Sequence, residues 1–87
     1  MELKGSEVTL LVLTTCLQCK ALKDLLTEHK VEYESTDVDL LFKDERDELF
    51  AEMKKYNAKK AFPVTFIGQD IIIGYQKSLI LDTLGLR

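Results

Sequence analysis

The stretch VTLLVLTTCLQCK, residues 8–20, joins a short apolar run to a pair of cysteines. Its first half, residues 8–13, is rich in branched apolar side chains, a pattern typical of a strand buried on both faces. From Cys16 to His29 the apolar period becomes that of a helix. The helical stripe consists of Ala21, Leu22, Leu25 and Leu26. Cys16 and Cys19 are therefore expected where a buried strand passes into the first turn of a helix.

Apolar patterns in the rest of the chain predict three further strands and two further helices. The strands are expected at residues 31–38, 64–67 and 71–73, and the helices at residues 44–56 and 77–84. The last two strands form a hairpin, and Gly85 ends the last helix. The predicted order is βαβαββα, an α/β fold in which three helices cover both faces of a four-stranded mixed sheet.

Length and composition bound the kind of protein. The chain has 87 residues, too few for a second core, so residues 1–87 are expected to form one domain. Apolar residues make up 46% and charged residues 31%, proportions typical of a globular chain. The longest strongly apolar run, residues 10–13, is too short to span a bilayer. The N-terminus lacks the pattern of a secretory signal, so a cytoplasmic protein without membrane contacts is expected.

Charged residues are unevenly distributed. The net charge is −3, and no basic stripe is interleaved with aromatic residues, so nucleic-acid binding is not expected. Eight acidic side chains against two basic ones lie between Val31 and Glu48, and a basic cluster follows. The cluster consists of Lys54, Lys55, Lys59 and Lys60. The ordinary interpretation of such runs is a solvated surface.

The two cysteines, Cys16 and Cys19, are too few and too close for a secreted disulfide scaffold, and they indicate redox or metal chemistry. At a helix start the first backbone N–H groups lack partners and the dipole is positive, so a thiolate at Cys16 is stabilised. Two intervening residues bring the second sulfur within bridging distance across the first turn. We therefore expect Cys16 to be the exposed attacking thiol and Cys19 the resolving one.

Other uses of the cysteine pair stay open at this point. A structural zinc site needs about four ligands. His29, the only histidine, lies roughly 20 Å away along the helix and is expected to end it, so a zinc site within one chain is excluded. Two chains could share an iron–sulfur cluster through two thiolates each. Two unreactive thiols, or an adaptor that binds thiol proteins at Pro63 without catalysis, are further alternatives.

Pro63, the only proline, begins the third expected strand in the segment AFPVTFI, residues 61–67. Proline lacks the N–H that a strand donates, so this position needs a reason. A cis Phe62–Pro63 bond would turn the chain sharply and expose the Phe62 backbone near the cysteines. A trans bond is more frequent in proteins, and the residues alone leave both states open.

Together these motifs resemble the glutaredoxin branch of the thioredoxin fold, over nearly the whole chain from about Val8 to Leu86. The shared features are the strand before Cys-x-x-Cys, the apolar–Pro–apolar strand, the turn after it, the ending IIIGY and a short last helix. The resemblance implies that Pro63 is cis and lies against the cysteine pair, and that the Phe62 backbone pairs with a bound thiol partner. The substrate-binding residues it implies are Leu17, Gln18, Phe62, Pro63, Gly74 and Tyr75.

The sequence also departs from the usual glutaredoxin pattern. Glutaredoxins commonly carry Pro-Tyr between the cysteines, a Lys shortly before them and a Gly-Gly-x-Asp turn. This chain has Leu17-Gln18, LTT at residues 13–15 and GYQK at residues 74–77. Two charge partners for glutathione are therefore missing, although Lys59 and Lys60 could hold one carboxylate. The Cys-apolar-Gln-Cys motif and the Gly-aromatic turn look more like redoxins that draw electrons from thioredoxin reductase and reduce ribonucleotide reductase.

The sequence thus predicts a thiol–disulfide oxidoreductase of thioredoxin fold that cycles Cys16 and Cys19 between dithiol and disulfide. We expect it to act on protein disulfides as a monomer, without a cofactor or a bound metal. The expected electron donor is a protein reductase of the thioredoxin-reductase type, and glutathione is the alternative donor.

Overall fold

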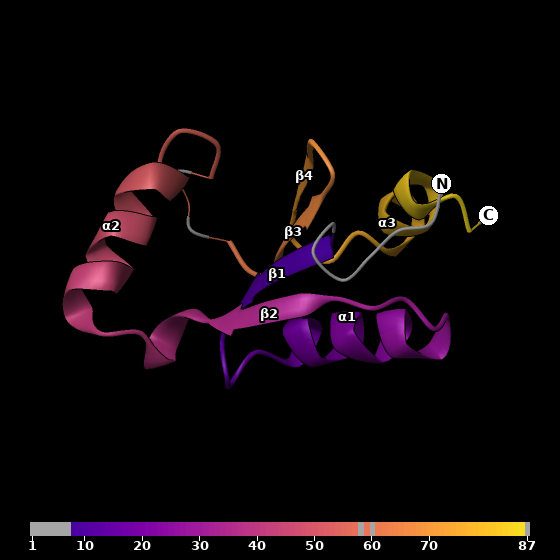
Figure 1. Cartoon of the computed structure of the whole chain (residues 1–87), viewed down its shortest axis with the longest axis horizontal. Helices are drawn as coiled ribbons and strands as arrows, with labels where there is room; N and C mark the ends of the chain where they lie inside the picture. The colour runs from indigo at the N-terminus through magenta and orange to yellow at the C-terminus, as the bar shows by residue number, and fades with distance from the viewer. Residues whose placement is uncertain (1–7, 58, 60, 87) are drawn as a thin grey trace.

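The computed structural model describes residues 8–57, 59 and 61–86, in which three helices flank a four-stranded sheet (Figure 1). The strands are β1 (Val8–Val12), β2 (Glu34–Asp37), β3 (Val64–Ile67) and β4 (Asp70–Ile73). The helices are α1 (Leu17–Glu28), α2 (Lys43–Met53) and α3 (Lys77–Leu84), and a 3-10 turn, Val38–Leu40, follows β2. The predicted order βαβαββα is confirmed.

The sheet has the strand order β2-β1-β3-β4. β1 pairs in parallel with β2 and antiparallel with β3, and β3 pairs antiparallel with β4. Leu11 lies opposite Val64, which in turn lies opposite Ile73. The ends of β1, β2 and β4 and the start of β3 therefore share one edge of the sheet. Cys16 follows β1 at this edge, and Pro63 directly precedes β3 there.

Alternation along β1 divides the core between the two faces of the sheet. Leu10 and Val12 belong to a cluster with buried side chains of α1 and α3. Leu11 belongs to a second cluster with Val38, Val64 and the α2 residue Met53. Figure 1 shows α2 at the left, apart from α1 and α3. The prediction that helices cover both faces is confirmed.

Two predicted boundaries are wrong by about three residues. The strand expected at 31–38 is confined to β2, because the residues before it complete the end of α1. Lys30 adopts a left-handed backbone (φ 58°), and the Val31 N–H donates to the Leu26 carbonyl at 2.8 Å. Helix α2 ends at Met53, because the Tyr56 N–H bonds three residues back rather than four.

The other boundaries lie within one residue of the predictions. Residues 64–67 and 77–84 are a strand and a helix as expected. Helix α3 ends at Gly85, whose left-handed φ of 74° suits a residue without Cβ. No helix in the described part of the chain is long and apolar enough to cross a membrane.

Candidate redox site

The two cysteines lie on the first turn of α1, as predicted. Cys16 is the N-cap residue with an extended backbone (φ −92°, ψ 115°). Its Sγ accepts a hydrogen bond from the Cys19 N–H at 3.1 Å. This N–H is among those that have no carbonyl partner at a helix start, so the sulfur takes the place of a capping side-chain oxygen. The local structure of the motif thus directs a backbone dipole at Cys16.

The pair is asymmetric in burial. Cys16 is half-buried, whereas only 2% of Cys19 is exposed. Burial raises the pKa of the Cys19 thiol to about 11, and the hydrogen bond to Cys16 acts in the same direction. A hydrogen bond with the Leu13 backbone and the charge of Lys23 partly oppose this rise in pKa. Cys19 is therefore a protonated thiol at neutral pH, and Cys16 is the sulfur that solvent reaches.

The Phe62–Pro63 peptide bond is cis, as the resemblance implied. Pro63 is buried, and its carbonyl accepts a hydrogen bond from the Gly74 N–H at 2.8 Å. This bond joins the segment before β3 to the segment after β4. The half-buried Phe62 and Tyr75 pack against the same core cluster as Cys16. The segment before β3, the segment after β4 and Cys16 thus all pack against the core cluster that lies between the sheet and α1.

The other two residues predicted to bind substrate lie at the start of α1. Leu17 is 84% exposed, and Gln18 is also exposed. They place an apolar and an amide side chain beside Cys16, and binding by them stays a prediction. Lys59 is exposed in the segment before Phe62, and Lys60 lies outside the described residues.

Sequence reasoning missed a contact that holds the loop before Cys16. The Asp39 carboxylate accepts hydrogen bonds from the N–H and the hydroxyl of Thr14. The Thr14 hydroxyl is the largest influence on this carboxyl and lowers the pKa of Asp39 below its usual value. The two residues are 25 positions apart, and no local pattern connects them. The contact was therefore not accessible from spacing.

Asn57 holds the chain that leads into Phe62. It is 4% exposed, its Nδ2 donates to the Ala61 carbonyl at 2.8 Å, and its Oδ1 accepts from the Ala61 N–H at 3.0 Å. A short amide side chain that bonds nearby backbone is typical of asparagine in loops. This tendency of asparagine is the one sequence signal that could have indicated that Asn57 closes the loop.

His29 is exposed at the C-cap of α1, at the opposite end of the helix from Cys16, as predicted. In the described part of the chain, no group of three or more His, Cys, Asp or Glu side chains is arranged to hold a metal ion.

The sheet order, the cysteines at the start of α1 and the cis proline before β3 define a redoxin of the thioredoxin fold. The glutaredoxin family model matches residues 8–72, and the chain belongs to the glutaredoxin family. Family and Cys-x-x-Cys together support a general thiol–disulfide oxidoreductase activity. A search of curated protein sequences gives no match.

Solved structures of archaeal redoxins are similar. Methanoredoxin from Methanosarcina acetivorans is 32% identical, with a TM-score of 0.80 over 90% of this chain and 83% of that one. The glutaredoxin from Methanosarcina mazei Go1 is also 32% identical, with a TM-score of 0.79 over 91% and 78% of the two chains. A glutaredoxin from Archaeoglobus fulgidus (24% identity, TM-score 0.80, 90% and 85% covered) supports the fold alone.

Proposed function

We propose that this chain reduces protein disulfides, with Cys16 as the attacking thiol and Cys19 as the resolving thiol. The observation that carries the proposal is the asymmetry of the pair. Cys16 is the half-buried N-cap of α1 and accepts the Cys19 N–H at 3.1 Å, whereas Cys19 is buried and its pKa is raised to about 11. Backbone dipoles at a helix start favour the negative charge of a thiolate, and attack requires a reachable thiolate.

The reaction has two exchanges. The Cys16 thiolate attacks one sulfur of the substrate disulfide, the substrate S–S bond breaks, and the other sulfur leaves as a thiolate that takes a proton from water. Cys19 then gives up its proton to solvent and attacks Cys16 Sγ. The mixed disulfide breaks, the second substrate thiol leaves, and two electrons have passed from the protein to the substrate. A separate reductant returns the Cys16–Cys19 disulfide to the dithiol.

We assign contact with the substrate to six residues around Cys16. They are Leu17, Gln18, Phe62, Pro63, Gly74 and Tyr75. Leu17, Phe62 and Tyr75 supply apolar surface, which favours a polypeptide over a small polar disulfide. We further propose that residues 1–87 form one domain, that it acts as a monomer, and that a protein reductase of the thioredoxin-reductase type returns the dithiol.

Trapping the intermediate tests the assignment of roles. Cys19→Ser is expected to accumulate a mixed disulfide with insulin, used as a disulfide-bonded probe, because the second exchange is blocked. Cys16→Ser is the matched control and is expected to form no adduct. Non-reducing electrophoresis and mass spectrometry identify the linked cysteine. An adduct through Cys19 in the Cys16→Ser protein would reverse the roles.

A further inference from the structure

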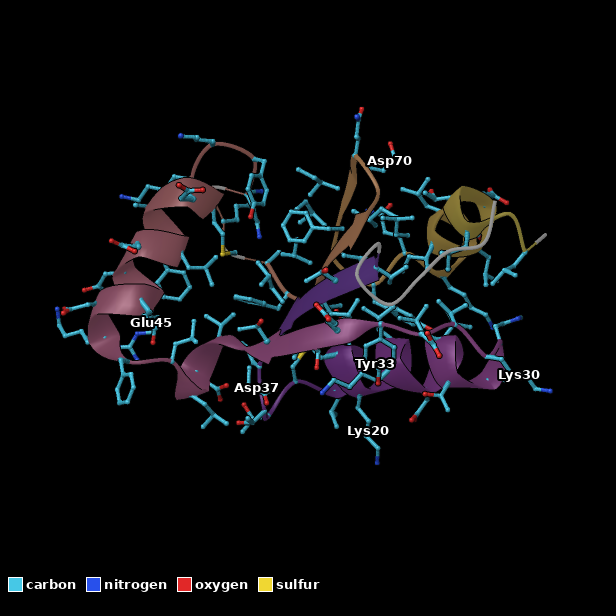
Figure 2. All side chains as sticks on the ribbon, in the orientation of Figure 1. Lys20, Lys30, Tyr33, Asp37, Glu45 and Asp70 are labelled. Carbon is cyan, nitrogen blue, oxygen red and sulfur yellow. The ribbon has the colours of Figure 1, made fainter. Side chains whose placement is uncertain are left out.

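An open groove lies between the sheet and helix α2, outside the cysteine pair. Its volume is about 750 Å³, and its apolar lining includes Leu11, Leu41 and Leu49. Its acidic side chains are Glu45, Glu48 and Glu52. Spacings of three and four residues place these glutamates on one face of α2, and Figure 2 shows Glu45 on that helix. We call this feature the acidic groove.

The acidic groove has an excess of negative charge. Lys55 is the only basic residue among those that line it in the described part of the chain. The ion pair between Lys43 and Asp47 at the start of α2 does not involve the three glutamates. Like charges three and four residues apart on a helix repel one another. A basic occupant would relieve this repulsion, and it would also be attracted from a distance.

Large apolar side chains are exposed beside Cys16 and on the connection that carries Leu41 into the acidic groove. Within the described residues, the three most exposed large apolar side chains are Leu17 (84%), Phe42 (82%) and Leu40 (71%). Leu17 directly follows Cys16, and the other two flank Leu41 on the connection between β2 and α2. Water-exposed apolar surface of this kind is stabilised when a partner covers it.

The connection that carries these side chains is fixed to the redox loop. Thr14, two residues before Cys16, donates hydrogen bonds to Asp39. Asp39 in turn is two residues before Leu41, which lines the acidic groove. The acidic groove therefore adjoins a connection that is hydrogen-bonded to the loop before Cys16.

We propose that the acidic groove, with Leu40 and Phe42 beside it, binds a basic and apolar segment of a protein substrate next to its disulfide. The segment carries Lys or Arg side chains for the glutamates and Leu- or Phe-like side chains for the apolar surface. This inference rests on the proposed function and names its substrate class. A second copy of the chain fits less well, because a symmetric contact would bring two sets of glutamates together.

Two synthetic peptides with the same internal disulfide and the same leucines test the proposal. One carries lysines beside the disulfide, and the other carries glutamines at the same positions. We expect kcat/KM to be about tenfold higher for the lysine peptide at low salt. We expect the ratio to fall toward one when salt rises from about 0.05 M to about 0.5 M, because added ions screen the glutamates.

Variants locate the effect. Glu45→Gln, Glu48→Gln and Glu52→Gln together are expected to bring the ratio of the two kcat/KM values close to one. The matched control removes three exposed acids elsewhere: Asp24→Asn, Glu28→Gln and Asp70→Asn. The control protein is expected to keep the ratio. Phe42→Ser is expected to raise KM for both peptides, because both carry the leucines.

The outcomes separate the two proposals. Equal kcat/KM for the two peptides at low salt, or a ratio that survives the triple glutamine change, overturns the acidic groove as a docking site and leaves the redox function standing. If the protein reduces neither of the two peptides and no small disulfide, the redox function itself is overturned. A dimer in sedimentation equilibrium that Phe42→Ser dissociates assigns the surface to a second copy and also overturns the proposal.

Discussion

The Asp39 carboxylate accepts hydrogen bonds from Thr14 through both of its oxygens. The Thr14 N–H lies 3.2 Å from Oδ1 and 3.3 Å from Oδ2, and the Thr14 hydroxyl lies 2.5 Å from Oδ2. The contact joins the loop that enters Cys16 to the segment that leaves β2. It therefore fixes the redox loop relative to the acidic groove.

This contact predicts a pH-dependent step at acidic pH. The Thr14 hydroxyl lowers the pKa of Asp39 from its ordinary 3.8, so the folded protein holds this carboxylate ionised to lower pH than the unfolded chain does. The stabilisation is present above pH 3.8 and is lost as the pH falls through the lowered pKa. The Thr14 amide resonance in NMR spectra should titrate in that range. In Asp39→Asn the Thr14 amide resonance should no longer titrate at acidic pH. If it still does, another group causes the pH-dependent step.

Asn57 predicts a loss of stability near Phe62. Asn57→Ala removes both hydrogen bonds to Ala61 and leaves the N–H and carbonyl of the half-buried Ala61 without these partners. We expect the free energy of unfolding to fall by about 1–3 kcal/mol, measured by urea denaturation. Asn57→Asp keeps the acceptor for the Ala61 N–H but sets a buried carboxylate oxygen against the Ala61 carbonyl, so a fall at least as large is expected at neutral pH. Equal stability of Asn57→Ala and the unchanged protein contradicts a loop-closing role.

Because the Thr65 hydroxyl is buried, we expect that its replacement by a methyl group stabilises the protein. Thr65 is fully buried in β3, and its Oγ1 has no hydrogen-bond partner among the described residues. Thr65→Val keeps the shape and removes the polar atom, so the free energy of unfolding should rise by about 1 kcal/mol. Thr9→Val, in the half-exposed part of β1, is the control and should change stability less. A loss of stability in Thr65→Val would mean that the hydroxyl has a partner.

Cys19 predicts a loss of stability in the reduced protein at alkaline pH. Its pKa in the folded state, about 11, lies above the ordinary 9.0, so the folded protein binds this proton more tightly than the unfolded chain. The resulting stabilisation is complete below pH 9.0 and is lost as pH rises through about 11. Urea denaturation of the reduced protein at several pH values measures it. Cys19→Ala should lack this component, and an identical pH profile in that variant contradicts the assignment.

Much of the fold was accessible from sequence because its strongest signals are local. The apolar run of β1, the period of α1 and the β3–β4 hairpin each arise within a few residues. The end of α1 was missed because Lys30 adopts a left-handed backbone without being glycine. The sequence pattern therefore predicts a strand at Val31, whereas its N–H donates to the Leu26 carbonyl and completes the end of α1.

The candidate site also combines features that local sequence predicts with features that depend on the fold. The capping of Cys16 was predictable because a helix start supplies unpaired N–H groups wherever it occurs. The Thr14–Asp39 contact and the acidic groove depend on how β1, β2 and α2 come together in space. The excess of acids between Val31 and Glu48 was visible in the sequence, but the ordinary interpretation was a solvated surface. Only the fold shows which of the acids line one groove.

The identity of the electron donor is the remaining prediction, and it depends on charges around the cysteines. Glutathione carries two carboxylates and an ammonium group, so its site needs a cation at one end and an acid at the other. Leu13, in the segment where the resemblance leads one to expect a lysine, is half-buried and packs against the α2-side core. Lys77 begins α3 at the place of the expected acid, and the Gln76 side chain donates to the Ile73 carbonyl. Both expected charge partners are thus absent.

Loss of two charge-assisted contacts of about 1.5–3 kcal/mol each weakens glutathione binding by about two orders of magnitude or more. We therefore expect faster turnover with a thioredoxin-reductase-type protein than with glutathione and its own reductase, in NADPH-coupled assays on one disulfide substrate. Leu13→Lys combined with Lys77→Asp should raise the glutathione-dependent rate, because it restores one charge at each end of the site. Lys20→Ala, which changes an exposed lysine on α1, is the control and should leave the preference for donor unchanged. Faster turnover of the unchanged protein with glutathione at cellular concentration would show that the missing charges do not decide the donor.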